Sequence, residues 1–272
     1  MNIGAITDKG LVRKTNQDAI FSKVSPDNKI GLFVIADGMG GHYMGDLASN
    51  KIIQEFEQWW LRFEAAEFNK TDSECMDELK EVLNEANSYI YINYSRDKAI
   101  SGSTIAVLLI YDKKYYMFNV GDTRIYMIDK NGVNLITVDH TLRTELENKT
   151  GVTETDIRNN PKRDALTKAV GTKSDISWHE TEGMVEGKRF CICTDGIYKF
   201  VDDELLKKIL VSHSSPQKIC DKLVQLVLKA GAYDNYSMYY ICPENKKQDG
   251  RTSAFCCIAL LLIAIILFII FR

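Results

Sequence analysis

The chain has 272 residues, of which 45% are hydrophobic and 26% are charged, and this is enough for one large domain with a buried core. The formal net charge of -3 argues against a nucleic-acid-binding surface, because such a surface is basic. The 7 cysteines include no C-x-x-C pair, so neither a zinc site nor a disulfide framework is supported.

Short apolar runs dominate the first 243 residues and predict many strands. Several runs are joined by short turns, at 112–114, 121–123 and 129–132, which is typical of neighbouring antiparallel strands. In chain order, strands are predicted at 3–7, 31–36, 104–111, 115–120, 124–128, 189–194 and 237–242.

Two long amphipathic helices interrupt these strands. Apolar residues at three- and four-residue spacings predict helices over 45–63 and 73–94, with Ser73 as a candidate cap for the second. Shorter helices are predicted over 203–211 and 216–230. Because strands are clustered and helices come in pairs, the pattern favours antiparallel sheets covered by helices over a doubly wound parallel sheet.

The last part of the chain has a different composition. Residues 254–271, AFCCIALLLIAIILFIIF, carry no charge and are about long enough to span a bilayer. A buried core helix is the alternative, but the run is uniformly apolar rather than amphipathic. A polar linker over 244–253 precedes it, and Lys246, Lys247 and Arg251 favour a cytoplasmic location for the preceding domain. We therefore expect a cell-membrane protein with one C-terminal transmembrane helix.

Four aspartates stand at the edges of apolar runs, each beside a glycine or an asparagine: Asp37, Asp122, Asp195 and Asp234. One such aspartate is ordinary turn chemistry. Four of them suggest more, because their carboxylates converge if the strands share a sheet edge. Converging carboxylates repel one another unless a cation neutralises them.

Oxygen ligands without histidine or cysteine suit hard ions such as Mg2+ or Mn2+. The neighbouring glycines allow a sharp turn, and the Gly38 carbonyl is a further candidate ligand. Two ions at such a site would activate water and clamp a phosphoryl group. Arg13, in LVRKTNQDA, is a candidate for holding the phosphate.

An ordered set of motifs resembles the metal-dependent protein phosphatases of the PPM type, or type 2C, in their bacterial branch. The set comprises RKTNQDA, VIADGMGGH, SGST, NVGDTRIY, DHT, LTKAVG, CTDGIYKFVDD and YDNYS, and it covers roughly residues 1–242. The resemblance implies an α+β fold, an α-β-β-α sandwich of two antiparallel sheets flanked by helices. It also implies a phosphatase domain over 1–243, ahead of the linker and the transmembrane helix.

The resemblance further implies roles for the site residues. Asp37 would bridge two Mn2+ or Mg2+ ions, the Gly38 carbonyl would bind the first, and Asp195 and Asp234 would bind the second. Asp122, with Asp195, would hold a weaker third ion. By the same resemblance, Arg13 would bind the substrate phosphate, and Asp18 and Gln17 would lie around the metal-bound waters. Residues 142–163 would form a flap beside the site.

The implied reaction is hydrolysis of phosphoserine and phosphothreonine in proteins by a metal-bridged hydroxide, opposing a serine/threonine kinase at the membrane. Many eukaryotic members have a histidine where this chain has Met39, so the acid that protonates the leaving group stays open between a metal-bound water and His42. Gln17 replaces a glutamate of other members. His140 is expected to be a hydrogen-bonding scaffold residue.

Two other functions remain as alternatives. A membrane-tethered pseudophosphatase that acts as a binding module would be favoured by the loss of a metal carboxylate, and all four are present. A nuclease or a phosphatase of small phosphoesters would share the metal chemistry, but a nuclease needs a basic groove.

Overall fold

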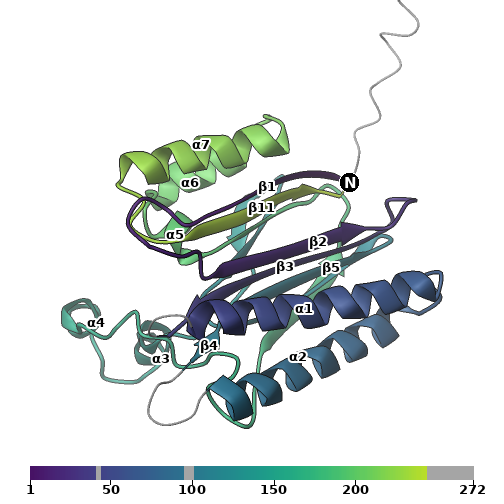
Figure 1. Ribbon diagram of the computed structural model, residues 1–272. Helices are drawn as coiled ribbons and strands as arrows, with labels where there is room; N and C mark the ends of the chain where they lie inside the picture. The colour runs from purple at the N-terminus through teal and green to yellow at the C-terminus, as the bar shows by residue number, and fades with distance from the viewer. Residues whose placement is uncertain (41–43, 95–100, 244–272) are drawn as a thin grey trace, which may run out of the picture.

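Two antiparallel sheets stack face to face in the computed structural model, which describes residues 1–40, 44–94 and 101–243 (Figure 1). The first sheet has the order β1 (Asn2–Asp8), β11 (Tyr236–Cys242), β10 (Arg189–Cys193), β7 (Arg124–Asp129) and β8 (Gly132–Leu135). The second has the order β2 (Asp18–Val24), β3 (Ile30–Met39), β5 (Ile105–Tyr111), β6 (Lys114–Val120) and β9 (His179–Met184), and the short β4 (Gly102–Ser103) pairs with the end of β3.

Helices cover the outer face of each sheet. The long α1 (Met44–Ala65) and α2 (Asp72–Tyr94) cover the second sheet, whereas α6 (Asp203–Leu210) and α7 (Pro216–Lys229) cover the first (Figure 1). The remaining short helices are α3 (Leu142–Glu147), α4 (Glu154–Asn159) and α5 (Asp195–Tyr198). The predicted α-β-β-α sandwich is therefore confirmed for the described residues.

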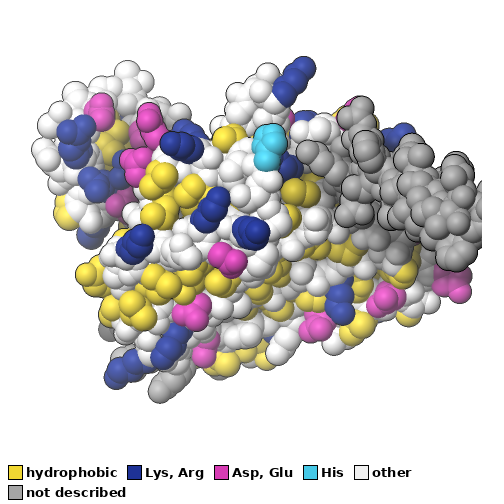
Figure 2. All heavy atoms as spheres, turned by 90° about the horizontal axis from the view of Figure 1, so that it is seen from above, with side chains coloured by type: hydrophobic (Ala, Val, Ile, Leu, Met, Phe, Trp, Pro, Cys, Tyr) yellow, Lys and Arg dark blue, Asp and Glu magenta, His cyan; other side chains and the backbone are white. Residues whose placement is uncertain are grey.

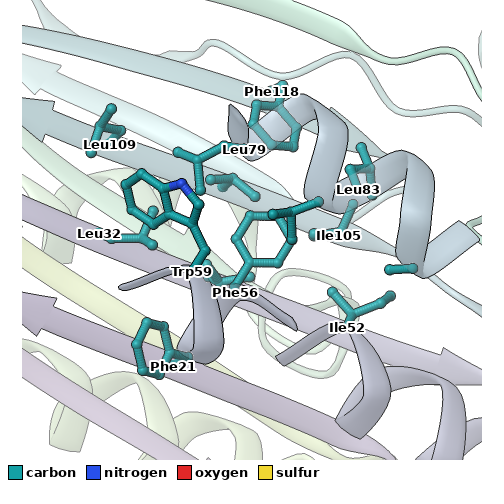
Figure 3. Close-up of a cluster of buried hydrophobic side chains, with 14 of the residues drawn as sticks. Phe21, Leu32, Ile52, Phe56, Trp59, Leu79, Leu83, Ile105, Leu109 and Phe118 are labelled. Atoms are coloured by element: carbon teal, nitrogen blue, oxygen red, sulfur yellow. The ribbon is translucent and has the colours of Figure 1, made fainter. Parts of the chain in front are cut away.

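Alternating side chains of the central strands fill two different apolar layers. In β3, Leu32 and Val34 face the helices α1 and α2, whereas Phe33 and Ile35 face the other sheet. This is why β3 reads as a continuous apolar run, since a strand buried on both faces has no polar side to expose. Figure 3 shows the layer beneath α1, where Phe56 and Trp59 pack against strand residues such as Ile105.

Local details differ from the sequence-based predictions in three ways. Strands β2, β4, β8 and β9 are absent from the predicted ranges, as are the short helices α3 to α5, because their apolar patterns are short or one-sided. Ser73 does not cap α2: Thr71 does, since its hydroxyl accepts from the Glu74 N–H while the Glu74 carboxylate accepts from the Thr71 N–H.

The third difference concerns the turn at 121–123. It was expected to join neighbouring strands of one sheet, as the turns at 112–114 and 129–132 do. Instead β6 lies in the second sheet and β7 in the first, so this turn carries the chain from one sheet to the other. Asp122 thereby lies at the junction between the two sheets.

The predicted linker (244–253) and transmembrane helix (254–271) lie outside the described residues. Within 1–40, 44–94 and 101–243, no helix has both the length and the apolar composition to cross a bilayer.

The surface over α6 and α7 carries mixed charge. Figure 2 views the molecule from this side and shows Lys and Arg side chains interspersed with Asp and Glu, with apolar side chains between them. No single sign of charge gathers on this face, which agrees with the mild net charge of -3.

Candidate active site

Asp37 lies near the end of β3, directly opposite Asp18 of β2 in the antiparallel register. Directly opposed residues of antiparallel strands place their side chains on the same face. The Asp37 backbone is held on the other side by Thr104, whose hydroxyl accepts from the Asp37 N–H at 3.1 Å and whose N–H donates to the Asp37 carbonyl at 2.8 Å. The central carboxylate is therefore fixed between two neighbouring segments.

The other three carboxylates reach the same place from connections between elements. Asp122 lies in the turn that crosses between the sheets, Asp195 begins α5 directly after β10, and Asp234 precedes β11. The expectation of a single shared sheet edge is therefore wrong, since the carboxylates come from both sheets and meet where the ends of the two sheets adjoin. All four line one cavity of about 270 Å3, together with Arg13, Gln17, Gly38, Met39, Gly40, Thr104, Asp164, Leu166, Lys199 and Asn235.

The glycines that follow two of these aspartates are required by close packing of the chain. A Cβ on Gly38 would lie 2.1 Å from the carbonyl oxygen of Gly45 in α1. A Cβ on Gly196 would lie 1.9 Å from the carbonyl oxygen of Asn235. Each Asp-Gly pair thus presents a carboxylate to the cavity while its glycine lets another backbone segment approach.

Two cationic side chains pair with the outer carboxylates. The Arg13 Nη2 lies 2.8 Å from Asp234 Oδ2 at the mouth of the cavity. The Lys199 Nζ lies 2.7 Å from Asp195 Oδ2 and 3.4 Å from Asp122 Oδ2. Lys199 was missed by the sequence analysis, although its position four residues after Asp195 at the start of a helix is the spacing of an ion pair.

Among the described residues, no Lys or Arg forms an ion pair with the two central carboxyls, Asp37 and Asp18, and the surrounding protein raises their pKa values. Desolvation, followed by the neighbouring carboxylates, raises the pKa of Asp37 well above its ordinary value. Desolvation likewise raises the pKa of Asp18 to about 7, against the opposing effect of hydrogen bonds from Ser237 and Thr194. Asp122, buried and close to Asp195, also has a raised pKa. Without a cation, the centre of the site thus favours neutral carboxylic acids.

The hydrogen bonds of Asp18 satisfy only one of its two carboxylate oxygens among the described residues. Its Oδ2 accepts from the hydroxyls of Ser237 at 2.7 Å and Thr194 at 3.0 Å. Its Oδ1 is buried and has no hydrogen-bond partner within the part of the chain that the structure describes. A buried carboxylate oxygen without a donor is costly, and a divalent ion or its bound water would satisfy it. Thr194, between β10 and α5, and Ser237, in β11, are supporting residues that the sequence analysis missed, since single hydroxyl residues carry no functional signature.

Asn235 positions the loop that bears Arg13. Its Nδ2 donates to the carbonyls of Lys9 and Thr15, both at 2.9 Å, and its Oδ1 accepts from the Gln17 N–H at 2.9 Å. The buried Asn235 amide thereby ties both ends of the loop that bears Arg13 to the segment that bears Asp234. The motif YDNYS contains this asparagine, but its spacing alone does not reveal the role.

The segment predicted to be a flap, 142–163, holds α3 and α4 and ends beside the cavity. Asp164, the next residue, lines the cavity and accepts hydrogen bonds from Arg143 at 2.9 Å and Arg163 at 3.2 Å. This acidic contribution to the wall was not predicted. Leu166, two residues further along the chain, also lines the cavity.

Two histidines were given different expected roles, a scaffold role for His140 and a possible acid role for His42. His140 accepts at Nδ1 from the Gly121 N–H at 3.1 Å, and desolvation lowers its pKa to about 4. It is therefore a neutral scaffold residue beside Asp122, as predicted. His42 lies outside the described residues. Met39 lines the cavity and has no proton to donate.

The donor set suits a hard divalent cation, because its ligating atoms are carboxylate and carbonyl oxygens. Among the described residues, no three His, Cys, Asp or Glu side chains are arranged as they stand to ligate one ion. Asp195 and Asp234 instead pair with Lys199 and Arg13. An ion shared by Asp37 and Asp234 would therefore require the Arg13–Asp234 pair to open or to shift.

The comparisons with known proteins agree with this geometry. The model of the family "Protein phosphatase 2C" matches residues 6–149, more than half of the chain. The serine/threonine phosphatase stp of Listeria welshimeri is 27% identical over 260 residues, covering 91% of this chain and 98% of that protein. The protein phosphatase PhpP of Streptococcus pneumoniae is 26% identical over 245 residues, covering 88% and 96%. Among solved structures, the serine/threonine phosphatase Stp1 of Staphylococcus aureus has a TM-score of 0.79 at 28% identity, covering 90% of this chain and 96% of that one.

Proposed function

The chain belongs to the protein phosphatase 2C family of metal-dependent serine/threonine protein phosphatases, and from this we propose that residues 1–243 form a catalytic domain that hydrolyses phosphoserine and phosphothreonine in proteins. The observation that carries the proposal is the convergence of four carboxylates and an arginine from both sheets on one small cavity. The cavity depends on contacts between residues far apart in sequence, such as Gln17 with Asn235.

The metal site of this proposal is built around Asp37. Asp37, the Gly38 carbonyl, Asp195 and Asp234 would hold two Mn2+ or Mg2+ ions, and Asp18 would support the waters around them. The raised pKa values of Asp37 and Asp18 favour this assignment, because a bound cation offsets the cost of ionising them. When bound, the ions supply the charge that acidifies a water molecule and stabilises the phosphoryl oxygens.

Arg13 is proposed to bind the substrate phosphate. Its side chain is 50% exposed at the mouth of the cavity, and its guanidinium already contacts a carboxylate there. A guanidinium presents parallel donors that match two phosphate oxygens as well as a carboxylate. Exchange of Asp234 for phosphate as the partner of Arg13 would free the Asp234 carboxylate for the metal.

The leaving alkoxide also needs a proton. Met39 has none, and His140 is neutral with its Nδ1 engaged by Gly121. A water in the cavity is therefore the proposed acid. His42, which lies outside the described residues, is the alternative.

The first experiment is hydrolysis of a phosphothreonine peptide by the full chain in detergent, with and without Mn2+, beside Asp37→Asn. We expect turnover that requires Mn2+ and that falls by at least about 100-fold in the variant, the scale of a lost catalytic contact. Absence of turnover in folded, Mn2+-loaded protein would reject the enzyme and favour the binding module.

We further propose that residues 244–253 are a linker and that residues 254–271 anchor the domain in the cell membrane with its active site in the cytoplasm. The uncharged sequence of 254–271 and the basic residues that precede it support this proposal. A tail anchor would raise the local concentration of the enzyme near a membrane-spanning serine/threonine kinase, whose substrates it would dephosphorylate.

Membrane fractionation tests this proposal. The full chain should resist extraction with alkaline carbonate, and a chain ending at residue 251 should appear in the supernatant with unchanged turnover of a soluble phosphopeptide. Release of the full chain by carbonate would overturn the anchor and leave the enzymatic proposal intact.

A further inference from the structure

Lys199 occupies the side of the cavity at which the third ion was expected. Its Nζ contacts both proposed ligands of that ion, Asp195 at 2.7 Å and Asp122 at 3.4 Å. Asp37 and Asp18, at the centre of the site, form no ion pair with a cationic side chain of the described residues. The two ends of the carboxylate cluster are thus neutralised by the chain itself, whereas the centre is not.

The environment of Asp122 reinforces the arrangement. The Tyr198 hydroxyl lies 3.1 Å from Asp122 Oδ2, the same oxygen that Lys199 contacts. The Arg124 guanidinium stacks 3.8 Å from the centre of the Tyr198 ring and pairs with Asp139. Lys199 and Tyr198 therefore both lie within hydrogen-bond distance of Asp122 Oδ2, and the Tyr198 hydroxyl also lies 3.0 Å from the Asp122 carbonyl oxygen. The Arg124 guanidinium adds a second cation against the Tyr198 ring.

We propose that Lys199 acts as a resident cation between Asp122 and Asp195, so that the wild-type chain binds divalent ions at Asp37 but none between Asp122 and Asp195. The proposal rests on the proposed metal site at Asp37. A divalent ion on the Asp195 oxygen that contacts Lys199 would meet strong repulsion from the ammonium, which a low-dielectric site screens weakly. Replacing the third ion by a side chain would also make that part of the charge independent of the metal supply.

The count of bound Mn2+ tests the proposal without relying on activity. Full chain in detergent is titrated with Mn2+, and free Mn2+ is measured by electron paramagnetic resonance. Lys199→Met keeps the aliphatic stem and removes the charge, and we expect it to bind one more Mn2+ per chain than the wild type. Lys199→Arg keeps the charge and should bind the wild-type number.

Asp122→Asn completes the test. In the wild type it should leave the number of bound Mn2+ unchanged, and in the Lys199→Met chain it should remove the additional ion. An unchanged count in folded Lys199→Met would overturn the proposal, as would loss of an ion from wild-type protein on Asp122→Asn. Failure of the proposed function gives a separate result, in which Asp37→Asn binds as much Mn2+ as the wild type.

Discussion

Asp18 and Asp37 lie opposite each other in neighbouring antiparallel strands, and the charge of Asp18 raises the electrostatic cost of ionising Asp37. The strands place two acids on one face, in surroundings that desolvate both. Such a pair destabilises the fold when both groups are charged, unless a cation lies between or beside them. The core of the candidate site is thus a region where folding and metal binding are linked.

The stability of the metal-free chain should therefore fall as the pH rises. The folded pKa of Asp18, about 7, lies above the ordinary value of 3.8, so the folded state holds the proton more tightly than the unfolded state. Its stabilising effect is complete below about pH 4 and is lost as the pH rises toward 7, at about 1.4 kcal/mol per pH unit for one group. Unfolding by urea in a chelating buffer at several pH values measures this slope.

Asp18→Asn is the matched variant, because it keeps the shape and removes the titration. It should flatten the slope between pH 4 and 7 and raise the stability of the metal-free protein near pH 7. Mn2+ should stabilise the wild type more at pH 7 than at pH 5, since binding displaces protons. An equal slope in the variant would contradict the assignment of the titration to Asp18.

Arg13→Ala should weaken substrate binding without unfolding the protein. The Arg13–Asp234 pair is partly exposed, and exposed pairs contribute about 0–1 kcal/mol to stability. Its contact with phosphate is charge-assisted and is expected to contribute about 1.5–3 kcal/mol, so that kcat/KM should fall by about 10- to 100-fold, mainly through KM. The kcat/KM of Arg13→Lys should lie between those of the wild type and Arg13→Ala, because an ammonium keeps the charge but lacks the planar pair of donors.

Lys14→Ala is the control for this experiment. Lys14 is exposed beside Arg13, so its removal changes the local charge equally. Steady-state kinetics on a phosphothreonine peptide should show a change below about threefold. A loss as large as that of Arg13→Ala would mean that the two residues act only through the general electrostatic field.

The sequence predicted the layers and the main acidic residues because both depend on short patterns. Apolar alternation and three- to four-residue spacing reported the strands and long helices, and Asp-Gly pairs marked the ends of the central strands. The sequence did not predict that the turn containing Asp122 crosses between sheets, since turn length is the same within a sheet and between sheets.

The roles of residues that act through tertiary contacts could not be predicted from local sequence patterns either. Lys199 meets Asp122 across 77 residues of chain, and Thr194 meets Asp18 across 176. Such contacts exist only after the two sheets stack. The requirement for glycine at position 38 was likewise only partly predicted. It arises from the close approach of Gly45 in α1, which is a tertiary contact and is independent of the turn after Asp37.

Gly38→Ala should be more destabilising than an ordinary glycine substitution. Its Cβ would lie 2.1 Å from a backbone oxygen of α1, so the helix or the strand must move. We expect a loss of more than about 3 kcal/mol in the free energy of unfolding, at the upper end of the range for overpacking. The control is Gly151→Ala, which has open space but a φ of +85° and should cost about 1–2 kcal/mol. Equal losses, measured by urea unfolding in chelator, would contradict the packing explanation.

Asn235→Ala should affect both stability and substrate binding, because its amide positions the loop that bears Arg13. The substitution removes three hydrogen bonds and leaves the Lys9 and Thr15 carbonyls without this donor. We expect a loss of about 3 kcal/mol in the free energy of unfolding, since each buried group left unpaired costs about 1–3 kcal/mol. At a temperature where the variant stays folded, KM for the phosphopeptide should still rise, as the Arg13 loop loses its anchor. The control is Asn93→Ala, at an exposed position of α2 where the side-chain amide donates to the Tyr89 carbonyl of the same helix. It should change stability by less than about 0.5 kcal/mol and leave KM unchanged. A wild-type KM in folded Asn235→Ala would restrict this asparagine to a purely structural role.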